Sequence, residues 1–353
     1  MGLRQRLIGL GMSFFEATGA HRMAASWTRG CGAILMLHRV ADEAPGLPGY
    51  APNAGLAITP AFLEATLDLL GRLGFDLVSM DEAARRLRQG PGQGERPFAA
   101  LTLDDGYRDT LRVAAPILRR HGAPYTVYVT PGFAARAARL WWCELEAAIG
   151  RLERVELSIG GERVSLPARD AAEKAAAFDI VYWRLRERSE AELLDGVATL
   201  ARSAGVDPAA FPAELCMDWD ELAELAADPL CTIGAHTMTH PRLAKIDAAR
   251  ARAEMADSRD ALARRLGRTP THFAYPVGDP TSAGPREFAL AAELGFETAV
   301  TTRPGMIFPE HGRALAALPR VSVSGLWQDA AYLEILLSGA PFLLWNKGRR
   351  IAA

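Results

Sequence analysis

The sequence predicts an α/β protein whose parallel strands form a barrel surrounded by helices. From residue 33 onward, short apolar runs alternate with amphipathic stretches, which is the pattern of parallel strands joined by helices. Roughly seven such units occur, close to the number at which a sheet closes on itself. No G-x-G-x-x-G follows the first apolar run, and polar residues follow many of the strands. Both observations favour a barrel over the alternative, an open doubly wound sheet.

The individual elements follow from periodicity and residue type. The apolar run 33–38 predicts the first strand, and the leucines and Phe62 within 60–73 have the spacing of a helix face. The run 124–130 is rich in β-branched and aromatic residues, which favour strands. The other strands are expected at 75–80, 98–104, 232–236, 272–276 and 296–302, with 318–323 as an eighth or irregular strand. The remaining helices are expected at 81–88, 108–120, 247–266 and 286–294.

One segment breaks the alternation. Between residues 131 and 217 lie a Glu- and Arg-rich helical stretch and a hairpin pattern over 155–166 that turns at Gly160-Gly161. We interpret about 138–216 as an α-rich insertion, because no linker precedes it and the strand rhythm resumes after it. The predicted organisation is an N-terminal helical extension (1–32), a barrel (33–325) that contains the insertion, and a C-terminal helical tail (326–353).

Composition excludes several classes of protein. The 353 residues are 49% hydrophobic with a formal net charge of −2, which argues against a nucleic-acid partner. The four cysteines form no C-x-x-C pair, so no disulfide framework is expected. The apolar run 7–15 is short for an export signal, and 335–345 falls well short of the ~20 residues that span a bilayer. We expect a cytoplasmic protein without a transmembrane helix, whose termini are candidates for peripheral contact with a membrane. The oligomeric state is not readable.

Two separated segments carry ligands typical of a metal site. Asp104 and Asp105 end a predicted strand, and Gly106 lets the chain turn, so both carboxylates can serve one site. His236 and His240 are four residues apart, which on a helical turn places both imidazoles on one face. With Asp105 they form a two-histidine, one-carboxylate set that leaves positions open for water and substrate. Such a set suits hydrolysis better than a structural role.

Each segment alone has a plainer explanation. An Asp-Asp-Gly sequence is usually a turn, and H-x-x-x-H is often found on a surface helix. A third segment, 273–278 with the sequence FAYPVG, lies at another predicted strand end. The three segments together favour a catalytic site.

The three segments resemble the T-F-D-D-G, H-[S/T]-x-x-H and F-x-Y-P-x-G signatures of the polysaccharide deacetylases, the NodB-homology group of carbohydrate esterase family 4. The resemblance covers about residues 33–325. Residues 37–40 (LHRV) are similar to the Y-H-x-[V/I] that often opens the domain, and 301–305 (TTRPG) resemble its closing strand and turn. It implies a distorted (β/α)7 TIM-like barrel and metal-dependent removal of acetyl groups from amino sugars.

The resemblance also implies residue roles. Asp105, His236 and His240 would hold a divalent ion, most often zinc and sometimes cobalt or manganese. Asp104 would be the general base that takes a proton from the attacking water. A backbone N–H near Tyr107 would help to stabilise the oxyanion.

The sequence departs from the family pattern at two points. The family often has an arginine just upstream of the proline of the third motif, which is absent here, so Arg39 or Arg320 would supply that charge. The late L-x-H, whose histidine is the general acid, is missing from 335–338. His38 at a strand end and His311 in a loop are the remaining candidate acids.

Aromatic residues are the candidates for substrate contact. Trp141 and Trp142 begin a predicted helix, where they either stack on a sugar or pack in the core. Tyr107 follows the aspartate pair, and Tyr275 and Pro276 lie in the third motif; all three are assigned to substrate binding.

The predicted activity is metal-dependent N-deacetylation of a glycan, oligosaccharide or sugar lipid that contains N-acetylglucosamine, which is hydrolysis of a carbon–nitrogen bond in a linear amide. The alternatives are an O-acetyl esterase of a glycan and a catalytically weak carbohydrate-binding barrel. A two-carboxylate glycosidase is disfavoured, because adjacent aspartates cannot flank a bond at the ~5–9.5 Å separation that this chemistry needs.

Overall fold

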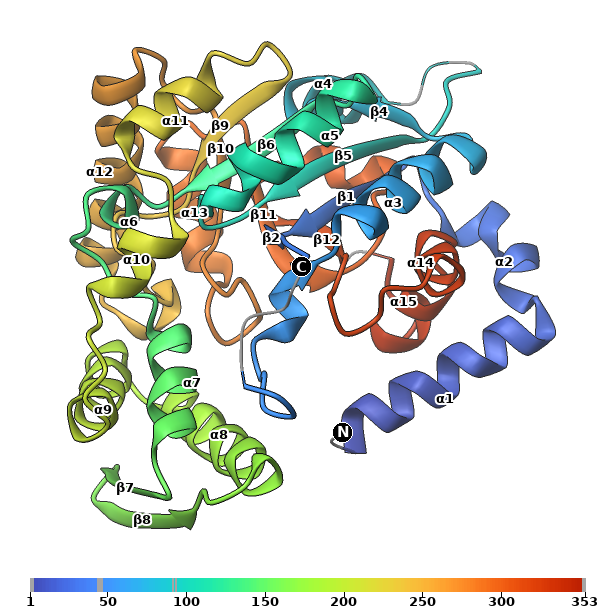
Figure 1. Ribbon diagram of the computed structural model, residues 1–353. Coiled ribbons are helices and arrows are strands. Elements are labelled where there is room, and N and C mark those ends of the chain that lie inside the picture. Colours follow the sequence, from blue (N-terminus) through green and yellow to red (C-terminus); the bar gives the residue numbers. More distant parts are fainter. Residues whose placement is uncertain (1–2, 43–46, 91, 93, 351–353) are drawn as a thin grey trace.

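Seven parallel strands close into a barrel in the computed structural model, which describes residues 3–42, 47–90, 92 and 94–350. The order around the ring is β1-β12-β11-β10-β9-β6-β5, and β5 pairs back to β1 over six residues on each strand. This confirms the expected distorted (β/α)7 barrel (Figure 1). The strands are β1 (Gly32–Leu37), β5 (Phe98–Leu103), β6 (Tyr125–Val129), β9 (Cys231–Ala235), β10 (His272–Ala274), β11 (Thr298–Pro304) and β12 (Leu318–Ser322).

The ring differs from the expected one at two strands. Residues 318–322, expected as an eighth or irregular strand, form β12 and close the ring between β11 and β1. The run at 75–80 yields only β4 (Asp76–Val78), which pairs with the first half of β5, while β6 pairs with the second half along the same edge. Strand β4 is short because Ser79 caps the next helix, its Oγ accepting from the backbone N–H of Glu82 at 3.2 Å.

The barrel strands are buried on both faces. All residues of β1, β5 and β6 are buried, which explains why these runs are continuously apolar rather than alternating. Short β2 (Arg39–Val40) and β3 (Ala57–Ile58) pair separately. Helices α3 (Pro60–Arg72), α4 (Met80–Gln89), α5 (Ala115–Arg120), α11 (Trp219–Ala226), α12 (Ala248–Leu266) and α13 (Pro285–Glu293) follow the strands. A π-helical turn, η2 (Thr110–Ala114), precedes α5 and interrupts the helix expected over 108–120.

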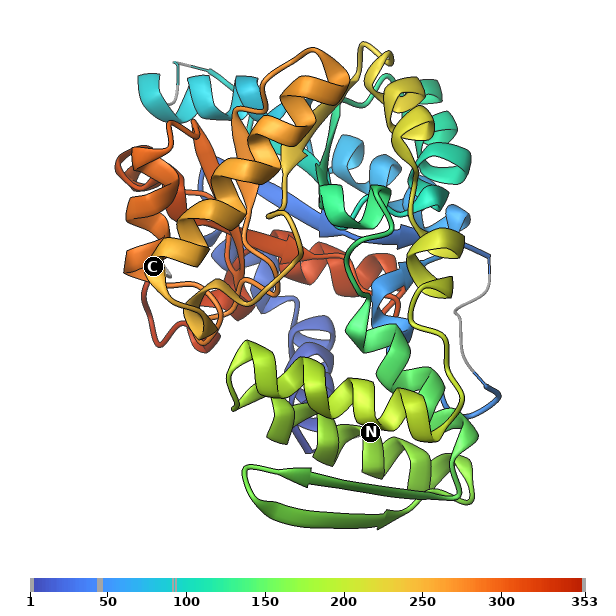
Figure 2. The same cartoon turned by 90° about the vertical axis from the view of Figure 1, so that its left-hand side faces the viewer.

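The segment between β6 and β9 projects from the barrel as a helical layer with a hairpin below it (Figure 2). It has its own apolar cluster, which includes Trp141, Leu145, Phe178 and Leu193 and is joined by Tyr107 from the barrel mouth. The hairpin turns at Gly160-Gly161, as expected. The elements are α6 (Pro131–Ala134), α7 (Trp141–Arg151), β7 (Arg154–Ile159), β8 (Glu162–Pro167), α8 (Ala171–Arg186), α9 (Glu190–Ser203) and α10 (Ala210–Leu215).

The two ends of the chain pack together on one side of the barrel. Helices α1 (Leu3–Thr18), α2 (Ala20–Thr28), α14 (Ala330–Leu337) and α15 (Ala340–Trp345) lie on the side of the molecule away from α6 and α10 (Figure 1). Thr28 Oγ1 donates to the carbonyl oxygen of Ser338 at 2.5 Å and joins the two ends. Among the helices described, none combines the length and apolar character needed to cross a bilayer. All four cysteines are free thiols.

Candidate metal centre and active site

The predicted carboxylates lie directly after β5, at the mouth of the barrel. Asp105 and Gly106 have φ of 71° and 69°, a left-handed pair that turns the chain sharply at the strand end. Aspartate tolerates this conformation better than most residues with a Cβ, and glycine adopts it freely. Both Asp104 and Asp105 line the same cavity as a result.

The three predicted metal ligands converge. Nε2 of His240 and Nε2 of His236 lie 3.2 and 3.4 Å from Oδ1 of Asp105. One ligand atom from each residue lies within 4.8 Å of the others, and all three side chains are buried. Burial alone would raise the pKa of Asp105, but hydrogen bonds from His236 and His240, in the form in which Nε2 carries a proton, outweigh burial and hold that pKa far below its usual range. The three residues therefore form a compact set of metal-ligating groups, one carboxylate and two imidazoles.

The expected helical turn from His236 to His240 is wrong. These residues follow β9 as a loop, with Thr237 and His240 at φ of 61° and 62°. The backbone N–H of His240 donates to Thr237 Oγ1 at 3.0 Å, and Glu254 of α12 accepts from the Thr239 backbone N–H at 2.8 Å and from its hydroxyl at 2.5 Å. These contacts hold a tight loop, and this loop brings the two imidazoles together. The four-residue spacing does not act here as a turn of helix.

The hydrogen bonding of His236 fits a metal ligand. Its Nδ1 lies 2.7 Å from the carbonyl oxygen of Ala274, an acceptor, so Nδ1 carries the proton. In the tautomer with its single proton on Nδ1, the lone pair of Nε2 faces the carboxylate oxygen of Asp105. Two lone pairs facing each other repel, and a cation between them removes this repulsion. The residues present thus match the donor set of a divalent ion.

Asp104 is held by a buried arginine. Arg320 of β12 donates from Nη1 and Nη2 to the two oxygens of Asp104 at 2.8 and 2.6 Å, and from Nε to the Thr301 carbonyl at 2.8 Å. Burial favours a higher pKa for Asp104, but Arg320 reverses the balance and lowers that pKa below its ordinary value. Of the two candidate arginines, Arg320 is the one that contacts Asp104. Arg39 instead pairs with Asp109, at 2.7 Å.

The two candidate acids lie in different places. His38 borders the metal cavity, with Nε2 4.0 Å from Oδ2 of Asp104. Burial lowers the pKa of His38, the two aspartates raise it in part, and Arg320 opposes them, so that the net direction is downward. His311 is buried beneath Phe308, where its Nδ1 accepts the Phe308 backbone N–H at 3.0 Å. The structure does not bring His311 to the cavity.

The cavity at the metal ligands measures about 580 Å³ and has aromatic walls. Trp141 stacks on Tyr182 with ring centroids 5.6 Å apart, and Trp142 lies 4.8 Å from the ring of His240. The lining comprises His38, Asp104, Asp105, His236, His240, Trp141, Trp142, Phe178, Asp179, Tyr182, Trp183, Pro52, Asn53, Gly55, Leu56, Val277, Thr302, Leu326 and Trp327.

The other predicted substrate residues do not line this cavity. The Tyr107 hydroxyl accepts a hydrogen bond from Nε1 of Trp142 at 3.1 Å, and its ring borders the adjoining cavity. Tyr275 is fully buried and donates to the carbonyl oxygen of Ala316 at 2.8 Å. Pro276 is buried as well, and the next residue, Val277, is the one that reaches the cavity.

Sequence reasoning missed several residues of the cavity wall. Trp183 on α8 is 52% exposed, and Trp327 follows β12 in a loop. No motif marks either residue, since their place depends on how the insertion and the C-terminal loop fold over the barrel. Glu254 was also missed, because nothing in the local sequence shows that it anchors the histidine loop.

A second cavity of about 380 Å³ adjoins the first, and Asn53 and Leu56 line both. Glu146 lies in its wall and accepts from Nδ2 of Asn53 at 2.6 Å, and its other carboxyl oxygen is buried with no hydrogen-bond partner among the residues that the structure describes. Burial raises the pKa of Glu146 to about 7, although Asn53 acts in the opposite direction.

A closed parallel barrel with polar groups gathered at the carboxyl ends of its strands is the architecture of a barrel enzyme. A family model described as polysaccharide deacetylase matches residues 92–299. The match spans more than half of the chain, so the chain belongs to the polysaccharide deacetylase family and is a deacetylase-type hydrolase. The matched range contains Asp104, Asp105 and both histidines, whereas His38 and Arg320 lie outside it.

Three solved structures share the fold at low sequence identity. The Streptococcus pyogenes deacetylase PplD in complex with acetate has a TM-score of 0.54 and 20% identity, over 83% of this chain and 92% of that chain. IcaB from Ammonifex degensii has a TM-score of 0.53 and 19% identity, over 88% and 97%. The de-N-acetylase from Aggregatibacter actinomycetemcomitans has a TM-score of 0.52 and 13% identity, over 86% and 99%. A comparison with curated proteins gave no match.

Proposed function

We propose that the protein is a metal-dependent N-deacetylase that acts on a glycan containing N-acetylglucosamine. The observation that carries the proposal is the convergence of Asp105, His236 and His240 beside an Asp104 that Arg320 holds in place. Family membership supports acetyl removal as the reaction. Zinc is the proposed ion, with cobalt or manganese as substitutes, because an imidazole–imidazole–carboxylate set suits these metals.

Asp105, His236 and His240 would hold the ion. When bound, a divalent cation in such a site acidifies water and polarises a carbonyl group. Asp104 accepts the proton of the attacking water, because its oxygens border the cavity and its carboxylate form is favoured by Arg320. The backbone N–H near Tyr107 stays the predicted donor to the oxyanion.

His38 is the proposed group that delivers a proton to the departing amine. His38 borders the cavity beside Asp104. It can therefore receive the proton that Asp104 takes from water and pass it to the amine. An amine leaves poorly unless it is protonated, whereas the alcohol of an acetate ester leaves more easily. A proton donor at this place therefore favours amide over ester hydrolysis.

The aromatic wall supports a saccharide substrate. Trp141, Trp142 and Trp183 line the same cavity as the aspartates, and the apolar C–H faces of pyranose rings pack well on aromatic side chains. The cavity volume is in the ordinary range for small-molecule sites, about 300–1,000 Å³.

Acetate release from N-acetylated chitooligosaccharides, with zinc added, tests the proposal. We expect turnover by the wild-type protein and its loss in Asp104→Asn. Release from acetylated xylan and not from chitin fragments would show an O-acetyl esterase instead. Sugar binding without turnover under zinc, cobalt or manganese would show a carbohydrate-binding barrel.

A further inference from the structure

Apolar side chains are exposed on the two helices at the amino end of the barrel. On α2, Met23 and Trp27 are one turn apart and are 83% and 73% exposed. On the neighbouring α15, Leu344 and Trp345 are 70% and 41% exposed. Large apolar residues exposed singly are common, but four on two adjacent helices form a patch that a partner can cover. We call these four residues the apolar patch.

The inner faces of the same helices are fixed to the protein. His21 and Thr28 of α2 are buried, His21 Nδ1 bonds to the carbonyl oxygen of Phe15 at 3.0 Å, and Thr28 reaches Ser338. Phe342 of α15 is buried as well. The exposed side chains therefore lie on the outward faces of anchored helices.

Basic residues follow both helices of the apolar patch. Lys347, Arg349 and Arg350 follow α15 and are exposed, and Arg29 follows α2. Among the described residues, none of these four makes an ion pair within 4.0 Å, although the guanidinium of Arg350 lies 5.3 Å from the Phe308 ring. The whole chain has a formal charge of −2, so this is a local concentration of positive charge.

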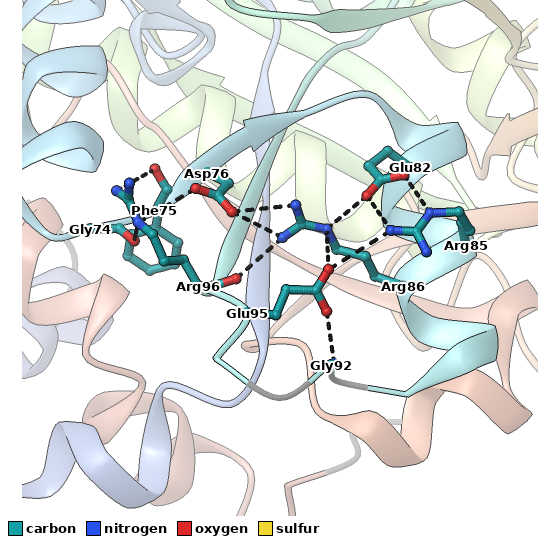
Figure 3. Close-up of polar contacts among 9 residues, drawn as sticks. All are labelled: Gly74, Phe75, Asp76, Glu82, Arg85, Arg86, Gly92, Glu95 and Arg96. Atoms are coloured by element: carbon teal, nitrogen blue, oxygen red, sulfur yellow. Dashed lines mark hydrogen bonds and ion pairs between the residues drawn. The ribbon is translucent and has the colours of Figure 1, made fainter.

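A cavity with arginine walls opens beside α2. It measures about 440 Å³ and is lined by Ser26 and Arg29 together with Arg86, Arg96 and Glu95. Figure 3 shows that the nearby acids are already paired: Arg86 lies between Asp76, Glu82 and Glu95, and Arg96 also faces Asp76. Arg29 differs, because among the described residues it makes no ion pair within 4.0 Å: its Nη1 donates to the Leu73 carbonyl at 3.4 Å, and its guanidinium lies 5.4 Å from the Phe75 ring. The wall of this cavity thus holds a guanidinium whose charge no described carboxylate pairs with directly, and an anionic group can approach it.

We propose that this end of the barrel docks on an anionic lipid bilayer. Tryptophan favours the headgroup level of a membrane, methionine and leucine enter the acyl region, and lysine and arginine contact lipid phosphates. Stable binding to a bilayer needs an apolar and an electrostatic contribution together, and both occur here. A second copy of the chain fits less well, because a symmetric contact would place two positively charged surfaces face to face.

Docking of this kind leaves the metal cavity free. The arginine-walled cavity includes Cys31 and Phe98, at the amino ends of β1 and β5, whereas Asp104 follows the carboxyl end of β5. Six residues of strand separate the two ends, which is about 20 Å. The cavity at the metal ligands would then open away from the bilayer, toward glycan in solution.

Co-sedimentation with vesicles tests the proposal, using the full chain and phosphatidylcholine vesicles with and without phosphatidylglycerol. We expect binding that requires phosphatidylglycerol and weakens at high salt. Met23→Ser/Trp27→Ser should lower the partition coefficient at least about tenfold, and Arg349→Ala/Arg350→Ala about fivefold for each residue. Ile180→Ser and Arg163→Ala/Arg169→Ala, which change exposed residues on the insertion, should bind like the wild type.

The proposal is overturned if vesicles do not bind the protein, if both vesicle types bind it equally, or if the control variants lose binding as much as the others. It is also overturned if sedimentation equilibrium shows a dimer that Met23→Ser/Trp27→Ser dissociates, which would assign the patch to a second copy. Vesicle binding needs no catalysis, so this outcome is independent of the deacetylase assay.

Discussion

Arg320 and Asp104 form a buried, bidentate ion pair that joins β12 to the end of β5. Each terminal nitrogen of the guanidinium donates to a different carboxylate oxygen, at 2.8 and 2.6 Å. The contact exists only because β12 closes the barrel against β1, next to β5. It supplies the charge that the third sequence motif lacks, and it orients the proposed base.

Arg320→Met should lower the free energy of unfolding by about 3–5 kcal/mol, because it leaves a buried carboxylate unpaired. It should also lower kcat more than it changes KM, since Arg320 contacts Asp104 and does not line the cavity. Arg320→Lys should restore only part of kcat, because lysine keeps the charge but lacks the planar two-donor geometry. Denaturant unfolding and steady-state kinetics measure the two effects.

Arg86→Met is the control for this arginine, because it breaks a partly buried charge network at the other end of the barrel. It should destabilise the protein without a selective fall in kcat. Equal losses of kcat in Arg86→Met and Arg320→Met would show that Arg320 acts only through stability.

Asp104→Asn should lower turnover by about 10²–10⁴-fold, the usual contribution of a general base. The variant keeps the side-chain size and one oxygen for Arg320, so the fold should persist. Acetate release and circular dichroism check the two expectations. Asp228→Asn changes another buried aspartate, paired with Arg119 at 2.7 Å away from the cavity, and should retain turnover. Full activity in Asp104→Asn would contradict the assignment of the base.

Removal of metal should abolish turnover and lower Tm. Zinc added at 100 times its dissociation constant should stabilise the fold by about 2.7 kcal/mol, because it binds the folded state. Asp105→Asn and His236→Gln should lose most of this thermal shift, whereas His121→Gln, at an exposed position, should keep it. Thermal unfolding with and without zinc therefore tests the site independently of activity. A wild-type shift that survives in both ligand variants would place the ion elsewhere.

His38→Ala should lower amide turnover more than ester turnover, because a departing amine depends more on protonation than an alcohol does. His311→Ala should leave both rates unchanged, since His311 packs beneath Phe308 outside the cavity. Parallel assays on an N-acetylated and an O-acetylated sugar give the comparison. If neither variant changes the amide rate, the proton donor is another group.

The sequence predicted best those parts of the site that local chain position determines. Asp104, Asp105 and His236 follow strands, and the carboxyl ends of parallel strands meet at one mouth, so their convergence was expected. The helical turn around His240 was wrong because left-handed φ at Thr237 and His240 leaves no mark in residues of these types. The metal ligands still converge, because the loop places His236 and His240 beside Asp105 without a helical turn.

The rest depends on contacts between distant segments. The choice between Arg39 and Arg320 could not be made from the sequence, because Arg39 follows the first strand, Arg320 lies within the last one, and only ring closure shows which of them meets Asp104. The sequence placed β4 in the ring and left the role of β12 open, whereas in the structure β12 closes the ring and β4 lies outside it. Both errors have one cause, because a short apolar run does not show which strands it will pair with. Likewise, Trp183 becomes part of the cavity wall only through the packing of α8 over the barrel.

Glu146 should make stability depend on pH. Its pKa is about 7 in the folded protein, against an ordinary value of 4.5, because burial disfavours the charged form. Between these values the folded state binds more protons at Glu146 than the unfolded state does, so the contribution of Glu146 to stability is fully present below pH 4.5 and is lost as pH rises through 7. The effect is on the order of 2 kcal/mol once screening by water is allowed for.

Glu146→Gln keeps an oxygen for Asn53 and removes the charge, so it should flatten this slope of stability against pH and raise stability above neutral pH. Denaturant unfolding across this pH range gives the slope, with the exposed Glu224→Gln as the control. A slope that is the same in Glu146→Gln and the wild type would show that this carboxyl ionises freely in the folded protein.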